Sequence, residues 1–394
     1  MIEEPQKQEV ISLCKQLIQQ PSTSGQEGGV AQVIASYMKA HGFTNVHADA
    51  YGNMMGSLVG KRPGPTVLFD GHMDTVPVPD PSVWTHAPFA AEELDGRIYG
   101  RGTSDMKGAL ASMLVAAAAF AKATAMDFAG TITVAGVVHE ECFEGVAARS
   151  ISKEVQPDYV VIGEASHLNL KIGQRGRAEI VLESFGKSCH SANPEKGINA
   201  VYKIMKAIEA IQQLEPPHHP IMGDGILELT DIQSHPYPGA SVVPDACRAT
   251  YDRRLLVGET KETVLAPLKD LLDRLMKEDP QARYRVSYAT GRESCYTGAE
   301  ISGERFFPGW LEEEQTPWIQ RVKASIEARG GKPRITQYNF CTNGSHYAGE
   351  AGIPTIGFGP SIEALAHTVD EYVELTELTG AVDGYQGIMT ALLS

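Results

Sequence analysis

A histidine and an aspartate follow the first strongly apolar run of the chain. Val67–Phe69 predicts a short buried strand, and Gly71 breaks the pattern, so that His72 and Asp74 stand at the strand end. Because side chains alternate along an extended chain, these two point to the same side. A ligating imidazole usually donates its other N–H to an acceptor, often a carboxylate. The pair is therefore interpreted as a metal ligand and the acid that orients it. A surface turn rich in His and Asp is the alternative.

A third candidate residue for a metal site lies in a loop rich in glycine. Residues Gly100–Gly108 read GRGTSDMKG and lead into the apolar, helix-forming run ALASMLVAAAAFAKA. The loop has neither the lysine–hydroxyl pair of a P-loop nor a dinucleotide fingerprint, which disfavours phosphate binding. Asp105 is therefore interpreted as a second metal carboxylate.

Three more acids follow later strand-like runs. Glu140 and Glu141 come soon after Gly130–Val138, and Glu164 follows Tyr159–Ile162. Sites of open α/β sheets form at the carboxyl ends of the strands, so these acids should meet the first histidine and aspartate there. Acidic groups gathered so closely would repel one another without a cation. The pattern therefore favours a bound metal over coincidence.

The adjacent glutamates allow two interpretations. The HExxH zinc motif is excluded, because Phe143 follows where a second histidine would be needed. One of Glu140 and Glu141 could bind metal while its neighbour acts as a general base on a water molecule. The alternative is a structural pair at the start of a helix, where the macrodipole favours acids.

The elements that must position these residues alternate between helix and strand. A helical pattern runs from about Glu3 to Gly42, with a loop at Pro21–Gly25 before a second helix at Val30–His41, and it returns after Asp105. Short strand-like runs lie between and after these helices, at Asn45–Ala48, Asn53–Leu58, Thr66–Phe69, Gly130–Val138 and Tyr159–Ile162. This order predicts an α/β sheet covered on both faces.

A different order of elements begins near residue 176. The expected elements are a strand from Arg177 to Phe185, a helix at Asn199–Leu214, strands at Ile226–Gln233 and Ala246–Arg253, a helix at Glu262–Glu278 and a strand at Tyr284–Ala289. A β-α-β-β-α-β order predicts a ferredoxin-like α+β domain. We expect this domain in residues 176–290, inserted into a first domain made of residues 1–175 and 291–394.

Composition narrows the possible partners. The chain has 394 residues, 42% of them hydrophobic, and a formal net charge of −15, which disfavours nucleic acid and anionic membranes. Its six cysteines are scattered without a CxxC pair, which indicates free thiols in a reducing compartment. The polar N-terminal run has no signal-peptide profile, and Ala109–Ala121 is too short to span a bilayer. We expect a soluble cytoplasmic protein.

Seven motifs together resemble the M20 metallopeptidase and deacylase family. They are DGHMDTVP, GRGTSDMKG, HEE, GEAS, KSCHSANPEKGINA, VVPD followed by YDRR, and GIPTIGFGPS with AHTVDEY. That family includes acetylornithine deacetylase, succinyl-diaminopimelate desuccinylase and carboxypeptidase G2. The Cys341–Gly344 stretch is similar to the STNG of the selenium-metabolism-linked M20 hydrolases. The resemblance implies a mixed-sheet, dimetal aminopeptidase-like catalytic domain with an inserted dimerisation (lid) domain.

The resemblance also implies two divalent metal ions per chain. By the family pattern His72 and Glu164 hold one ion, Glu141 and His367 hold the other, and Asp105 bridges both. A cis peptide is expected between Asp105 and the next residue. His, Asp and Glu ligands without cysteine suit zinc, with cobalt or manganese as alternatives.

The remaining implied roles concern catalysis and substrate. Asp74 would orient the first histidine and Glu140 would be the general base. His190 matches a histidine that reaches the partner subunit's site and stabilises the oxyanion, which implies a homodimer. Arg254 matches an arginine that holds a substrate carboxylate, a role suited to its fork of donors. Asn343 lies where relatives approach the substrate.

Two positions depart from the family pattern. Ser241 stands where the family often has Asn, and Asn343 stands where it often has Asp. Both lie near the substrate in relatives, so these departures concern substrate identity. We expect hydrolysis of an amide C–N bond in an N-acyl amino acid or short peptide by a water that two metals activate. A two-metal phosphoesterase and a non-catalytic, metal-containing binding module are the alternatives.

Overall fold

The chain folds into two compact units in a computed structural model that describes residues 2–394. The first unit comprises residues 2–174, 292–302 and 311–394, and the second comprises 175–291 and 303–310. The expected boundaries after residues 175 and 290 lie within one residue of these divisions. The return of residues 303–310 to the second unit was not expected.

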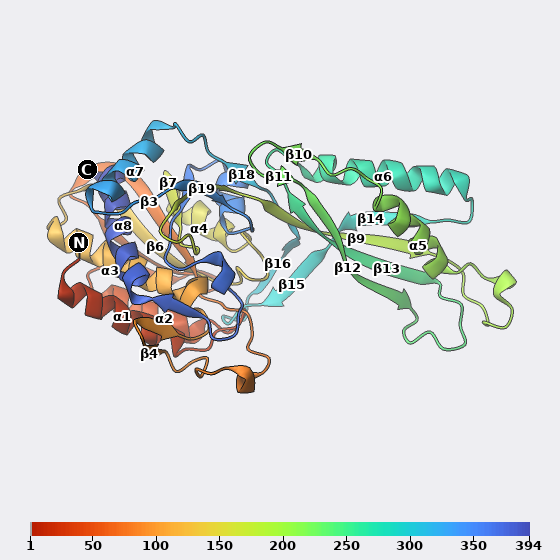
Figure 1. Ribbon diagram of the computed structural model, residues 1–394, viewed down its shortest axis with the longest axis horizontal. Helices are drawn as coiled ribbons and strands as arrows, with labels where there is room; N and C mark the ends of the chain where they lie inside the picture. The colour runs from red at the N-terminus through yellow and green to blue at the C-terminus, as the bar shows by residue number, and fades with distance from the viewer. Residues whose placement is uncertain (1) are drawn as a thin grey trace. The chain divides into compact units, whose positions relative to one another are not determined.

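A mixed sheet forms the centre of the first unit (Figure 1). Its neighbouring strands run in the order β1 (Thr44–Ala48), β2 (Met54–Val59), β6 (Ala129–Val137), β3 (Arg62–His72), β7 (Tyr159–Ile162), β20 (Thr355–Gly357) and β8 (Leu170–Gln174), with β19 (Ile335–Tyr338) beside β8. The central strands β6, β3, β7 and β20 are parallel, and β1 and β2 are antiparallel additions. The carboxyl ends of the four central strands therefore share one edge.

Helices bury the central strands. The helices of this unit are α1 (Glu4–Ile18), α2 (Gly28–Ala40), α3 (Gly108–Ala123), α4 (Ala148–Val155), α7 (Pro317–Ala328) and α8 (Leu375–Leu393). Both α3 and α8 pack against β3 and β6, whereas α2 contacts β1 and β2. Residues 67–72 of β3 are all buried, which requires cover on both faces of the strand, as the sequence predicted.

The apolar helix after Asp105 is a core helix. Residues Thr103–Ala123 are long and apolar enough to cross a membrane by length and composition, and 78% of the relevant window is buried inside the structure. This segment is longer than the apolar run Ala109–Ala121 on which the sequence argument rested. Thr103–Lys107 forms an irregular wide turn before α3 begins at Gly108.

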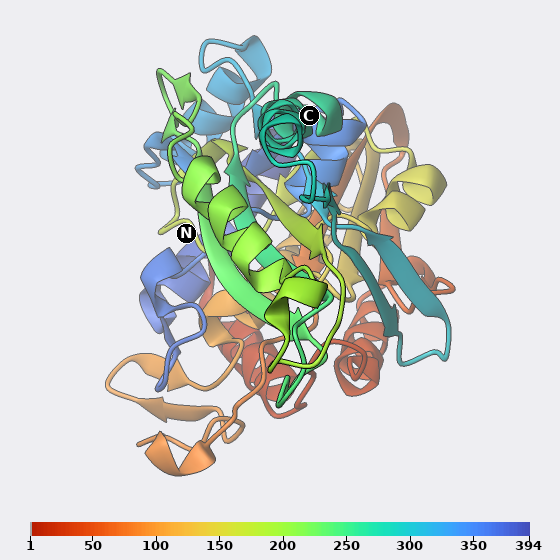
Figure 2. The same ribbon diagram turned by 90° about the vertical axis from the view of Figure 1, so that its right-hand side faces the viewer.

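The second unit has the predicted ferredoxin-like order. It contains β9 (Gly176–Phe185), α5 (Ala200–Ile211), β12 (Ile226–His235), β13 (Ala246–Leu255), α6 (Lys261–Glu278) and β14 (Tyr284–Tyr288), with β17 (Phe306–Phe307) paired to β9. The antiparallel sheet order is β12-β13-β9-β14, and α5 packs on β9, β13 and α6 (Figure 2). Apolar residues of the sheet and both helices form one core, from Ala178 on β9 to Leu272 on α6.

Short elements complete the chain. They are β4 (Glu92–Leu94), β5 (Arg97–Tyr99) and β21 (Tyr372–Glu374) in one small sheet, the pairs β10 (His218–His219) with β11 (Gly223–Asp224) and β15 (Thr290–Ser294) with β16 (Glu300–Glu304), and β18 (Trp310–Leu311).

Candidate metal centre

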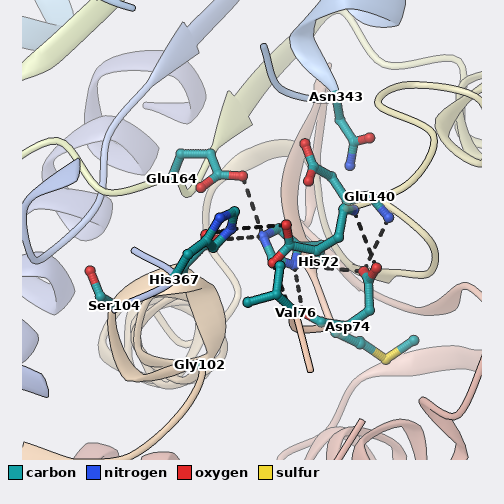
Figure 3. Close-up of polar contacts among 12 residues, drawn as sticks. His72, Asp74, Val76, Gly102, Ser104, Glu140, Glu164, Asn343 and His367 are labelled. Atoms are coloured by element: carbon teal, nitrogen blue, oxygen red, sulfur yellow. Dashed lines mark hydrogen bonds and ion pairs between the residues drawn. The ribbon is translucent and has the colours of Figure 1, made fainter. Parts of the chain in front are cut away.

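The predicted ligands of the first unit meet at the carboxyl edge of the parallel strands (Figure 3). His72 is the last residue of β3, Glu140 follows β6 by three residues, and Glu164 follows β7 by two. All three are buried, with exposed fractions of 1%, 6% and 4% respectively. The three side chains therefore lie at the strand ends where the sequence argument expected them, and their roles stay predictions.

Asp105 lies between two histidines. Its Oδ1 is 2.8 Å from His72 Nε2, and its Oδ2 is 3.1 Å from His367 Nε2. Beyond the histidines, His72 Nε2 is 3.4 Å from Glu164 Oε1, and His367 Nε2 is 3.0 Å from Glu141 Oε2. Two clusters of nitrogen and oxygen atoms thus share one carboxylate, which matches the arrangement that the family resemblance implied. The peptide after Asp105 is cis, as expected.

Asp74 contacts His72 through its main-chain oxygen, whereas the prediction gave this role to its carboxylate. His72 Nδ1 lies 2.8 Å from the Asp74 main-chain oxygen and 3.7 Å from its carboxylate. That carboxylate instead accepts hydrogen bonds from the Ser24 hydroxyl at 2.7 Å and from the backbone amides of Glu140 and Glu141 at 3.1 and 3.2 Å. Asp74 therefore orients the imidazole through its main chain and fixes the glutamate pair through its side chain.

The glutamate pair is not at the start of a helix. Residues 139–147 form turns, and the next helix, α4, begins only at Ala148. The helix-terminus explanation for Glu140 and Glu141 was therefore wrong. The loop presents Glu141 Oε1 to the backbone amide of Val76 at 3.2 Å, which leaves Oε2 facing His367.

The environment of the cluster raises the pKa values of its three glutamates and of His367, and lowers the pKa of Asp105. Burial raises the pKa of Glu141 and of Glu164 to about 7, and it raises the pKa of Glu140 well above its usual value. Hydrogen bonds to Asp105 and Glu141 raise the pKa of His367 to about 10. Burial opposes ionisation of Asp105, but the bonds from both histidines hold its pKa below the usual value. Such a cluster concentrates negative charge where a divalent cation would neutralise it.

The donor set fits divalent metal. The ligand atoms of His72, Asp105 and Glu141 lie within 4.8 Å of one another, and so do those of His72, Glu140 and Glu164. Among residues 2–394, Glu140 Oε1 is a buried oxygen with no hydrogen-bond partner. Imidazole nitrogens and carboxylate oxygens without thiolate suit zinc, cobalt or manganese.

Glu371 is a functional candidate that the sequence argument did not single out. This fully buried acid accepts hydrogen bonds at Oε1 from the backbone amides of Gly102, Ser104 and Asp105, at 3.1, 2.8 and 3.1 Å. Its Oε2 accepts a hydrogen bond from Arg101 Nη1 at 2.6 Å. The carboxylate therefore holds the loop that presents the shared metal ligand. Its position in the AHTVDEY motif was the available signal.

The Glu371→Gln variant is expected to bind metal about 10–100-fold more weakly. This is the usual effect of losing a residue that forms hydrogen bonds to a metal ligand or to its loop. The amide nitrogen would face Arg101 Nη1, so the ion pair would be lost and the Asp105 loop would loosen. Competition with a chromophoric chelator measures the affinity. Glu374→Gln is the matched control, because Glu374 pairs with Arg97 with both side chains over a third exposed. Equal affinities of Glu371→Gln and wild type would contradict the positioning role.

The predicted site residues also include His190, Arg254 and Asn343. His190 and Arg254 belong to the second unit, so their roles stay predictions. Asn343 is 1% exposed, and both ends of its amide bond to buried groups. The predicted contact of Asn343 with substrate stays a prediction.

Comparisons with known proteins agree with the geometry. The sequence profile of peptidase family M20/M25/M40 matches residues 68–391. The uncharacterized protein YgeY of Escherichia coli K12 is 33% identical over 379 residues, covering 95% of this chain and 92% of that protein. Succinyl-diaminopimelate desuccinylase 2 of Ruegeria sp. TM1040 is 27% identical, covering 96% and 94%. The fold is similar to that of Bacillus subtilis YXEP, described as a dinuclear metal binding M20 peptidase, with a TM-score of 0.73, 13% identity, and 98% and 99% of the two chains covered.

Proposed function

The chain belongs to peptidase family M20/M25/M40, and from this premise we propose that it is a two-metal hydrolase of an amide C–N bond. The proposed substrate is an N-acyl amino acid or a short peptide. The observation that carries the proposal is the position of Asp105, which directs one carboxylate oxygen to His72 and the other to His367. A single carboxylate between two sets of candidate ligands could hold a pair of ions close together.

The residues divide into those that hold metal and those that act on the substrate. His72 and Glu164 would hold one ion, Glu141 and His367 the other, and Asp105 both. Two bound ions, with zinc preferred and cobalt or manganese as alternatives, would acidify a water and polarise the scissile carbonyl.

Glu140 is proposed as the general base. Its buried Oε1 has no partner within the described chain, and burial raises its pKa, which suits a group that accepts and returns a proton. Glu140 would take a proton from the attacking water and then deliver it to the leaving nitrogen. Asp74 fixes the backbone of Glu140 and so sets the direction of this carboxylate.

His190 is proposed to donate to the oxyanion from a second copy of the chain. In this exposed residue Nδ1 accepts the backbone amide of Ala192 at 3.0 Å. With Nδ1 accepting that bond, Nε2 is the ring nitrogen proposed to donate to the oxyanion. Arg254, which is paired with Asp252 in the same unit, is proposed to hold a substrate carboxylate.

A homodimer is proposed through the second unit. Its edge strand β12 exposes Ile226 and Ile232 at 47% each, and α5 exposes Tyr202 at 68% and Met205 at 55%. An unpaired edge with apolar side chains is a common site of strand pairing between chains. A cytoplasmic location is also proposed, because all six cysteines are free thiols.

The His190→Ala variant is expected to keep both metals while kcat falls about 10²–10³-fold, the usual effect of losing one oxyanion donor. Metal analysis and steady-state kinetics on the same preparation measure both quantities. His235→Ala is the matched control, because His235 is an exposed histidine of the same unit that pairs with Asp245. A parallel fall in bound metal would show that His190 is a ligand and not a donor.

The proposed function is tested by hydrolysis across a panel of N-acetyl, N-succinyl and N-carbamoyl amino acids and dipeptides, with one phosphomonoester included. Zinc- or cobalt-loaded protein should release an amino acid in a chelator-sensitive reaction. Cleavage of the phosphomonoester alone would favour a phosphoesterase. Two bound metals without turnover of any C–N substrate would favour a binding module.

A further inference from the structure

The side chain of Asn343 is buried between strand β3, which carries His72, and the turn that carries Glu140. Its Oδ1 accepts the backbone amide of Gly145 at 2.8 Å, and its Nδ2 donates to Asp70 Oδ1 at 3.0 Å. In Figure 3 the amide end of Asn343 points towards the side of the cluster that carries Glu140. The amide of Asn343 therefore accepts a hydrogen bond from the Gly145 turn through its oxygen and donates one to β3 through its nitrogen.

Each end of this bridge leads to a functional residue. Asp70 is 1% exposed and precedes His72 by two residues on β3, and its Oδ2 accepts the Tyr347 hydroxyl at 2.8 Å. Gly145, in a left-handed conformation with φ of 86°, closes the turn that carries the glutamate pair.

That turn is held at both of its ends. The Asp74 carboxylate accepts the amides of Glu140 and Glu141 at the start. Asn343 accepts the Gly145 amide at the end, and the Ser345 hydroxyl donates to the Glu144 carbonyl at 3.2 Å. The direction of the Glu140 carboxylate therefore depends on anchors on both sides.

We propose that Asn343 is a positioning residue that ties the Glu140 loop to the strand carrying His72, and that this position requires an amide. The proposal rests on the proposed function only in taking Glu140 as the base. A carboxylate at position 343 could still accept the Gly145 amide. However, it could not donate to Asp70, and two buried carboxylates would then face each other.

The chemistry predicts an asymmetric pair of substitutions. Asn343→Asp should be harmful, because it brings the two acids together. Asp70→Asn alone should be mild, because the new amide can accept from Asn343 while the Tyr347 hydroxyl rotates to accept. The double variant Asp70→Asn/Asn343→Asp restores a donor–acceptor pair with the direction reversed. It should therefore rescue Asn343→Asp.

The experiment compares the four proteins by kinetics and by hydrogen exchange. Asn343→Asp is expected to lower kcat about 10–100-fold at saturating metal, the usual effect of removing a hydrogen-bond partner of an active-site element, with KM little changed. The double variant should return to within about threefold of wild type. Mass-spectrometric amide exchange over residues 139–147 should rise in Asn343→Asp and fall back in the double variant. This second readout needs no substrate, so it tests the positioning role even if the protein hydrolyses nothing in the panel.

Two further variants keep the proposal falsifiable. If Asn343→Asp does not fold, Asn343→Ala removes both bonds without adding charge and should show the same faster exchange and lower kcat. Tyr347→Phe is the matched control, because it removes the other bond to Asp70 and leaves the Asn343 bridge. The proposal is overturned if Asn343→Asp behaves as wild type, if the double variant is no better than Asn343→Asp, or if Tyr347→Phe lowers kcat equally.

Discussion

Replacement of Glu140 by glutamine is expected to lower kcat by about 10²–10⁴-fold while both metals stay bound. Glutamine keeps the size of the side chain but cannot accept and return a proton. The side chain of Glu140 is buried, with an exposed fraction of 6%, and its Oε1 has no hydrogen-bond partner among residues 2–394. Single-turnover kinetics and metal analysis of the same preparation would measure the effect.

The neighbouring residue supplies the control for this prediction. Glu141→Gln makes the same chemical change one position along the same loop, where Oε2 faces His367 at 3.0 Å. That variant should lose metal affinity, whereas Glu140→Gln should not. Because the Glu140 carboxylate also lies within 4.8 Å of the ligand atoms of His72 and Glu164, it has a rival role as a ligand. Loss of metal from Glu140→Gln would establish that rival role.

Replacement of Asp105 by alanine is expected to weaken both metal sites at once. Each ion would lose its shared ligand, and His72 and His367 would lose the carboxylate oxygens now 2.8 and 3.1 Å away. Loss of a general base alone lowers activity by up to about 10⁴-fold. At a fixed, limiting metal concentration the activity of Asp105→Ala should fall at least this far, because the variant loses the ions as well as the geometry of the site. Isothermal titration with zinc would measure both affinities.

The outcome for Asp105 separates a bridged pair from two independent sites. Asp127→Ala is the control, because Asp127 is an exposed acid of the same unit that pairs with Arg62. If Asp105→Ala weakens one site and leaves the other with wild-type affinity, Asp105 is an ordinary ligand and the bridging assignment is wrong.

The sequence could predict the main strands and helices from hydrophobic periodicity, and the meeting of the acids from their positions just after strands. Apolar runs located β3, β6 and β7, and acids just after them had to meet because parallel strands end at one edge. The β-α-β-β-α-β order of the second unit followed from the same periodicity. Each of these arguments uses residues that are neighbours in the chain or share an element.

The hydrogen bonds that hold the metal-binding loops in place could not be predicted from local sequence patterns. Glu371 reaches the Asp105 amide across 266 residues, and Asn343 reaches Asp70 across 273. Glu371 stands in the AHTVDEY motif and Asn343 in the Cys341–Gly344 stretch, but neither motif shows which distant group the side chain contacts. Two basic residues of the Gly100–Gly108 loop also make contacts that the sequence does not reveal. In the structure Arg101 pairs with Glu371 and Lys107 donates to the Gln20 carbonyl, both from buried positions.

Anomalous diffraction from crystals of the zinc-loaded protein would test the central claim most directly. The account predicts two peaks per chain about 3.5–4 Å apart, the usual spacing of a two-metal site. One oxygen of Asp105 should contact each peak, with His72 and Glu164 on one ion and Glu141 and His367 on the other. A single peak, or two peaks that share no ligand, would contradict the two-metal centre on which the proposed hydrolysis depends.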